Sequence, residues 1–194
     1  MKLVPPAVPH HAAIELASHV RPARASDLTN VTALTSAAYA DYATQMGADL
    51  WAPYSAGLRA TPDTMDATVV AELDGEVVGA VRYHRPASDR LGLPPEASMV
   101  GALAVLPAHQ GRGIARRLME ECQRRAVTDG AATLMLHTAP FMERAVELYL
   151  RLGFTRSPMY DVRADEVFSL PNPSGLVAHA YALPLADDAV EVAS

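Results

Sequence analysis

The chain of 194 residues has very little cysteine and very little lysine, with Cys122 and Lys2 the single residue of each type. One cysteine cannot form an intramolecular disulfide, which is typical of proteins in a reducing compartment. The chain also lacks any run of the roughly 20 apolar residues that a membrane-spanning helix needs. Its net charge of -6 is opposite in sign to the basic surface of a typical nucleic-acid-binding protein. These absences predict a cytoplasmic protein with neither a nucleic acid nor a membrane as partner.

The length and composition favour one domain. A chain of this length that is 50% hydrophobic can bury one core but is short for two. Prolines and small residues in 1–19 predict a flexible leader, so we expect a single domain at 20–186 and an acidic tail at 187–194. His10 and His11 in the leader could bind a metal ion, but two solvated histidines are the simpler interpretation.

The spacing of apolar residues predicts alternating strands and helices. A strand at 20–24 and a helix at 28–44 begin the domain, with Ser26 or Asp27 as the N-cap. The prolines and glycines of 45–65 predict a loop with at most a short helix. Further strands are expected at 67–73, 77–84, 97–106, 132–138, 155–168 and 177–185, and further helices from near Gly111 to Asp129 and from 140 to 153. This order predicts an α/β (α+β) fold, a mixed sheet with helices on both faces.

The most informative stretch is 103–115, Leu-Ala-Val-Leu-Pro-Ala-His-Gln-Gly-Arg-Gly-Ile-Ala. An apolar strand breaks at Pro107 into a turn with glycines at 111 and 113, and a helix follows. The first amides of a helix have no intrahelical partner, so they can bind an anion such as a pyrophosphate. Glycine at these positions lets a phosphate come close to the backbone.

Two well-known phosphate-binding loops do not fit this stretch. The loop of the P-loop NTPases needs a lysine after its last glycine, and Lys2 is far away. The dinucleotide fingerprint needs a third glycine where Arg116 stands. The remaining pattern at 110–115, Q-x-x-G-x-A, resembles the coenzyme A loop of the GNAT N-acetyltransferase superfamily. A second segment at 145–154, A-x-x-L-Y-x-x-x-G-F, resembles another element of the same superfamily.

The resemblance implies a fold, a co-substrate and site residues. The fold would have a mostly antiparallel sheet of about six to seven strands. The co-substrate would be acetyl-CoA, with no metal ion. The backbone N–H of Val105 would donate to the thioester carbonyl, and Tyr149 would be the general acid, since a phenol keeps its proton at neutral pH. The residues implied to hold the cofactor are Leu103, Ala104, Val105, Gln110, Gly111, Arg112, Gly113, Ile114 and Ala115.

Two departures from the superfamily pattern concern the chemistry. Many relatives carry a glutamate in the central strand as general base, and 97–106 contains no acid. The base is therefore left unassigned, with a water chain as one alternative. Met142 stands where relatives often have asparagine, so one contact that relatives usually make to the pantetheine arm of coenzyme A is not expected here. The side chains that could act as the base are Glu96, Glu72, His137 and His179.

Candidate acceptor contacts lie at both ends of the predicted domain. Tyr39 and Tyr42 share a helix face, and Trp51 and Tyr54 follow in the predicted loop. His179 and Tyr181 alternate along the last strand. Aromatic rings can bind an amine by stacking or cation–π contact, and ordinary packing is the alternative.

We therefore expect an acetyl-CoA-dependent N-acetyltransferase. It would act on a primary amine of a small molecule or peptide by direct attack in a ternary complex, and a homodimer is left open. The alternative is a non-catalytic domain that binds or senses coenzyme A or acyl-CoA.

Overall fold

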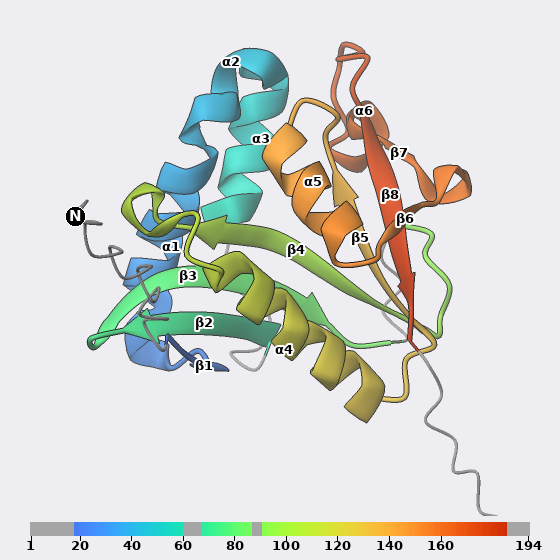
Figure 1. The fold of residues 1–194 in the computed structure, drawn as a ribbon. Coiled ribbons are helices and arrows are strands. Elements are labelled where there is room, and N and C mark those ends of the chain that lie inside the picture. The colour runs from blue at the N-terminus through green and yellow to red at the C-terminus, as the bar shows by residue number, and fades with distance from the viewer. Residues whose placement is uncertain (1–17, 60–66, 87–90, 186–194) are drawn as a thin grey trace, which may run out of the picture.

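The computed structural model describes residues 18–59, 67–86 and 91–185. These residues form an eight-stranded sheet in the order β1-β2-β3-β4-β5-β8-β6, with β7 also paired to β8. All neighbouring strands are antiparallel except β4 and β5, which are parallel (Figure 1). The strands are β1 (His19–Pro22), β2 (Thr68–Leu73), β3 (Glu76–His84), β4 (Ala97–Val105), β5 (Thr133–Thr138), β6 (Thr155–Arg156), β7 (Val162–Arg163) and β8 (Val177–Pro184). The predicted mixed, mostly antiparallel sheet is confirmed, with one strand more than the upper expected number.

Helices cover both faces of this sheet, as predicted. In Figure 1, α1 and α3 lie behind the sheet, and α4 and α5 lie in front. The helices are α1 (Leu28–Tyr39), α2 (Ala43–Met46), α3 (Ala48–Arg59), α4 (Ile114–Thr128), α5 (Glu143–Arg151) and α6 (Ala164–Val167). In the part of the chain that is described, none of these helices is both long and apolar enough to cross a membrane.

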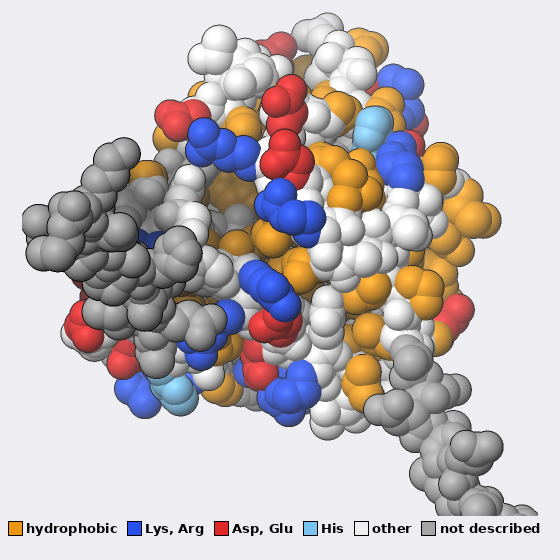
Figure 2. Space-filling model, viewed as in Figure 1, with side chains coloured by type: hydrophobic (Ala, Val, Ile, Leu, Met, Phe, Trp, Pro, Cys, Tyr) orange, Lys and Arg blue, Asp and Glu red, His pale blue; other side chains and the backbone are white. Residues whose placement is uncertain are grey.

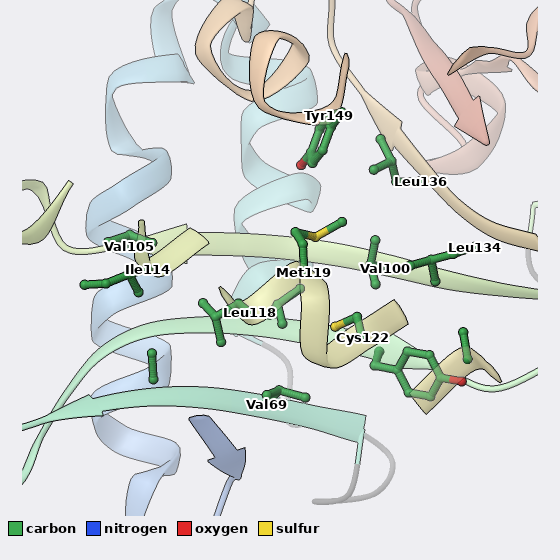
Figure 3. Close-up of a cluster of buried hydrophobic side chains, with 14 of the residues drawn as sticks. Val69, Val100, Val105, Ile114, Leu118, Met119, Cys122, Leu134, Leu136 and Tyr149 are labelled. Carbon is green, nitrogen blue, oxygen red and sulfur yellow. The ribbon is translucent and has the colours of Figure 1, made fainter. Parts of the chain in front are cut away.

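The main core lies between the sheet and the front helices. Leu118, Cys122 and Ala126 follow one another along α4 at a spacing of four, so they face the sheet together. Figure 3 shows this layer, with Leu118, Met119 and Cys122 of α4 between Val69 of β2 and Val100 of β4. Burial raises the pKa of the Cys122 thiol to about 12, so Cys122 is a packing residue with no thiolate at neutral pH.

An ion-pair cluster at the back attaches α1 to the first two strands. The Arg21 guanidinium lies 2.6 Å from Asp27 at the start of α1 and 2.5 Å from Glu72 on β2. The Arg21 guanidinium holds the pKa of the Asp27 carboxyl below its usual range. Because Arg21 and Asp27 are both buried, each charge needs the other, and removing one would leave an uncompensated buried charge.

Three sequence-based expectations are corrected by the structure. The expected loop at 45–65 contains α3, whose residues Leu50, Tyr54 and Leu58 recur every fourth position and pack inward despite Pro53. The expected strand at 155–168 is divided into β6, a 3-10 turn at Pro158–Tyr160, β7 and α6, since Pro158 has no N–H to continue a ladder.

The helix expected from near Gly111 begins at Ile114. Gly111 and Gly113 have φ of 74° and 77°, which an α-helix does not allow. Of the leader and tail expectations, 1–17, which include His10 and His11, and 186–194 lie outside the described residues.

Candidate active site

The two central parallel strands, β4 and β5, separate halfway along their length. Their last paired residues are Val100 and Leu136, and beyond this pair the second half of β4 is paired with β3 alone among the described strands. The N–H of Leu106 donates to the carbonyl of Val78 on β3. Because successive residues of an antiparallel strand point their backbone groups to opposite sides, the N–H and C=O of Val105 point away from β3. The second half of β4 thus turns the N–H of Val105 toward the gap, where no neighbouring strand among the described residues pairs with it, while side chains bind the carbonyls of Leu103 and Val105.

A β-bulge lies at the point where the strands separate. Ala80 pairs with Ala104 and Arg82 with Gly101, so Ala102 and Leu103 together face one residue of β3. Ala102 has φ of 51°, in the left-handed region that a residue with a side chain rarely adopts. A bulge bends its strand and redirects the following groups, which is why bulges occur beside functional sites.

A cavity of about 1060 Å³ follows this free edge of β4. Figure 2 shows a hollow on this face of the molecule, with hydrophobic side chains inside it and charged side chains at its rim. Almost all of the residues proposed for the cofactor line the cavity, and Arg112 does not. The lining members of that set are Leu103, Ala104, Val105, Gln110, Gly111, Gly113, Ile114 and Ala115.

The loop between β4 and α4 forms one end of the cavity. Within this loop the Gln110 side chain folds back toward β4, and its Nε2 donates to the carbonyl of Val105 at 3.3 Å. The first backbone hydrogen bond at the start of α4 runs from Arg117 N–H to the carbonyl of Gly113. The amides of residues 114–116 therefore have no carbonyl partner within the helix, and they lie at its positive end.

Tyr149 lies in the same cavity. It comes from the inner face of α5, and in Figure 3 its hydroxyl end points from α5 toward β4. Burial raises the pKa of the Tyr149 phenol far above its usual value, with smaller contributions from Tyr39 and Tyr42. The phenol is therefore protonated at every physiological pH, so it can donate a proton and cannot accept one.

Most of the candidate bases lie away from the cavity. Glu72 is held by Arg21 behind the sheet. Glu96 precedes β4, roughly 25 to 30 Å from Val105 at ~3.3 Å per residue. His179 pairs with Thr138 across β5 and β8 but is not a lining residue.

His137 is the candidate base that lines the cavity. Its Nε2 lies 2.8 Å from the carbonyl oxygen of Tyr160. Because a carbonyl can only accept, Nε2 carries the proton and Nδ1 keeps the lone pair. This Nδ1 is buried without a partner among the described residues, and burial lowers the pKa of the imidazole.

The candidate acceptor residues divide into two groups. Tyr39, Tyr42 and Tyr54 line the cavity, and Trp51 lies directly behind Tyr54 with 6.2 Å between ring centroids. His179 and Tyr181 are not lining residues, and the Tyr181 ring is buried in the main core beneath the Arg156 guanidinium. The structure thus brings together the early aromatic residues and leaves those of the last strand outside.

Sequence reasoning singled out Met142 but missed two aromatic residues and three arginines that line the cavity. Phe141 and Phe168 extend the aromatic wall, and no spacing relates them to Tyr39 or Tyr54 in the sequence. Met142 is buried in the cavity wall, and its sulfur accepts a hydrogen bond from the Thr138 hydroxyl at 3.6 Å. Where α4 and α5 line the cavity, positive charge comes from the side chains of Arg116, Arg144 and Arg151.

Comparison with known proteins agrees with this geometry. Residues 31–154, more than half of the chain, match the model of the acetyltransferase (GNAT) family. The chain belongs to this family. The separated β4–β5 pair and the glycine loop beside it both lie within the matched residues.

Solved structures share the fold. An acetyltransferase from Salmonella typhimurium, solved with acetyl-CoA, is 20% identical with a TM-score of 0.61, over 92% of this chain and 99% of that one. A GCN5-related N-acetyltransferase from Kribbella flavida is 22% identical with a TM-score of 0.59, over 87% of this chain and 98% of that one. An N-acetylglutamate synthase from Neisseria gonorrhoeae is 17% identical with a TM-score of 0.61, over 87% of this chain but 35% of that longer one.

Proposed function

We propose that this protein is an acetyl-CoA-dependent N-acetyltransferase that acetylates a primary amine by direct attack in a ternary complex. The observation that carries the proposal is the placement of the free edge of β4, the glycine loop and Tyr149 around one cavity. Each of these features serves a separate step of acyl transfer, and a domain that only bound coenzyme A would have no use for a buried phenol at the β4 edge.

The residues around the gap suit coenzyme A. A pantetheine arm carries amide groups whose carbonyls can accept from the unpaired N–H groups of β4 as an added strand would. The left-handed glycines at 111 and 113 and the unpartnered amides of 114–116 suit a pyrophosphate. Arg116, Arg144 and Arg151 add positive charge on the same side of the cavity. Acetyl-CoA bound there would supply an activated acetyl thioester.

The chain's own groups can then assist the transfer. The N–H of Val105 points into the gap and can donate to the carbonyl oxygen as negative charge develops on it, a contribution of about 3 kcal/mol when one such donor is removed elsewhere. Tyr149 gives its hydroxyl proton to the departing sulfur. His137, neutral at pH 7, is the residue that we propose to take the proton of the attacking amine through water, since it alone among the candidate bases lines the cavity and its basic Nδ1 is itself buried.

The test is replacement of Tyr149 by phenylalanine, which removes the hydroxyl and keeps the ring. We expect kcat to fall by about 100-fold or more, as is usual when a general acid is lost, while KM for acetyl-CoA stays within about twofold. The measurement is thiol release from acetyl-CoA with a panel of primary amines.

A matched control is Tyr83→Phe. Tyr83 is also a buried phenol with a raised pKa, but its hydroxyl bonds to Ser98 and Asp129 at the far end of the sheet. We expect this variant to lose thermal stability and to keep its kcat. If wild-type protein releases no thiol with any amine while coenzyme A still raises its melting temperature, the alternative of a non-catalytic binding domain replaces the proposal.

A further inference from the structure

Aromatic rings from separate parts of the chain meet along the wall of the cavity. We call Tyr39, Tyr42, Trp51, Tyr54, Phe141 and Phe168 the aromatic cluster. Its rings touch in a continuous series, with centroid separations of 5.8 Å for Phe141 and Tyr42, 6.1 Å for Tyr42 and Tyr39, 5.9 Å for Tyr39 and Tyr54, 5.9 Å for Tyr54 and Phe168, and 6.2 Å for Tyr54 and Trp51.

The aromatic cluster is a cavity wall and not a closed core. Every member except Trp51 lines the cavity, and all are only partly buried. The rings pack against a buried cluster of smaller or more flexible side chains that also lines the cavity, Met46, Leu50, Ala139, Met142 and Ala164. The rings therefore expose their surfaces to whatever enters the cavity.

A hydrogen bond connects the aromatic cluster to the strand edge. The Tyr39 hydroxyl donates to the carbonyl of Leu103 at 3.1 Å, on the free edge of β4 beside the bulge. Tyr54 in turn is hydrogen-bonded to Tyr39. A molecule lying against these rings thus has its near end at the part of β4 where the acetyl group would be presented.

The charges around the aromatic cluster are few. Among the described lining residues, the carboxylates near these rings are Asp41, beside Tyr42, and Glu143, which follows Phe141 and Met142, and both are exposed. The lining cations, Arg116, Arg144 and Arg151, are on α4 and α5. A carboxylate at the rim can attract one ammonium group. A polyamine would bring further ammonium groups against rings that offer them no partner.

From these observations we infer that the acceptor is an arylalkylamine, a primary amine on a short chain that ends in an aromatic group. The ring would pack against the aromatic cluster by edge-to-face or offset contact, and the amine would reach the edge of β4. This inference rests on the proposed function and narrows it to one class of acceptor. Phe168, on the segment that follows α6, is the ring that we expect to set the preference.

The experiment compares phenethylamine, spermidine and glutamate as acceptors for the full chain with acetyl-CoA. We expect kcat/KM for phenethylamine to be at least about tenfold higher than for the other two. Phe168→Ala should raise KM for phenethylamine about threefold to tenfold, with KM for acetyl-CoA unchanged. Phe168→Asp should reverse the order and favour spermidine. Met159→Ala, an exposed side chain on the neighbouring turn, should leave every constant unchanged.

A binding measurement covers the case in which a variant is less stable. Trp51 is the chain's only tryptophan and touches Tyr54, so phenethylamine added to the coenzyme A complex should change its fluorescence. A preference for spermidine or glutamate, or an unchanged phenethylamine KM in folded Phe168→Ala, would overturn the inference while the acetyltransferase proposal stands. If no amine is acetylated although coenzyme A binds, the proposed function is wrong and the inference is wrong with it.

Discussion

The two walls of the cavity are made of different parts of the polypeptide. The donor wall, formed by the second half of β4, the glycine loop and the start of α4, presents backbone N–H and C=O groups. The acceptor wall, formed by the aromatic cluster, presents side-chain rings. Backbone groups are the same whatever the residue, so a donor wall of this kind can be kept while sequences diverge. Side-chain rings change with single substitutions, so the acceptor wall can change specificity without changing the fold.

The largest expected effect is on the donor wall. Gly113→Asp places a side chain and a negative charge where the backbone has φ of 77° and where the phosphates would lie. We expect affinity for coenzyme A to fall by at least about 100-fold, measured by isothermal titration calorimetry.

The control for this variant lies at the other end of the same helix. Gly130 has φ of 72° and, like Gly113, has no neighbouring atom of the described residues within 4 Å of the place that a β-carbon would take. Gly130→Asp therefore introduces similar backbone strain and the same charge away from the cavity. It should lower the melting temperature and leave coenzyme A affinity unchanged; equal losses of affinity in both variants would show that strain, and not the phosphate site, is responsible.

An intermediate effect is expected at His137 of β5, which also lines the cavity. Burial lowers the pKa of its imidazole, so the neutral form persists below pH 6.5. We expect kcat/KM to be constant near neutral pH and to fall in acid with a midpoint below about 6.5. His137→Gln should lower kcat by about tenfold to 100-fold and remove this acid limb of the profile.

Stability has to be followed in the same experiment. Because the folded-state pKa of His137 is lowered, the unfolded chain binds the proton first, and stability is lost as pH falls below about 6.5. Melting temperatures at each pH separate this loss from the kinetic effect. His179→Gln is the matched control, since His179 is on the adjacent strand and does not line the cavity. An acid limb that persists in folded His137→Gln would assign the base elsewhere.

The smallest effect is electrostatic and should appear on one wall only. Arg116 and Arg151 have carboxylate partners, Glu120 and Glu147, whereas Arg144 has no carboxylate within 4.0 Å among the described residues. Arg144→Ala should raise KM for acetyl-CoA about twofold to fivefold at low salt, and the difference should shrink as salt screens the charge. KM for phenethylamine should change little with salt, and a strong salt dependence there would contradict an apolar acceptor wall.

The donor wall could be predicted from the sequence because its requirements are local. A phosphate near the backbone needs glycine at defined positions, and Gly111 and Gly113 are adjacent to the strand and helix that they connect. Tyr149 is found through its own segment at 145–154. The separation of β4 from β5 could be inferred only by resemblance, since Val100 and Leu136 carry no mark of being the last pair.

The acceptor wall could not be assembled from the sequence because it is set by tertiary contacts. Trp51 and Tyr54 were expected in a loop, but burial of Leu50 and Leu58 outweighs the unfavourable Pro53 and makes α3 a helix. Phe168 reaches Tyr54 only because Pro158 ends β6 early and the chain folds back through α6. Such contacts depend on where whole elements lie and not on spacing within one element.

The free edge of β4 also has a consequence for the lifetime of the protein. A sheet with an unpaired central strand is incomplete, and a ligand that pairs with that edge stabilises the folded state by RT ln(1 + [L]/Kd), about 2.7 kcal/mol when its concentration is 100 times Kd. The fraction of molecules that open and become available to proteases would then vary with the concentration of acyl-CoA in the surroundings. The same edge that we propose to present an acetyl group would make the abundance of the protein depend on the supply of that group.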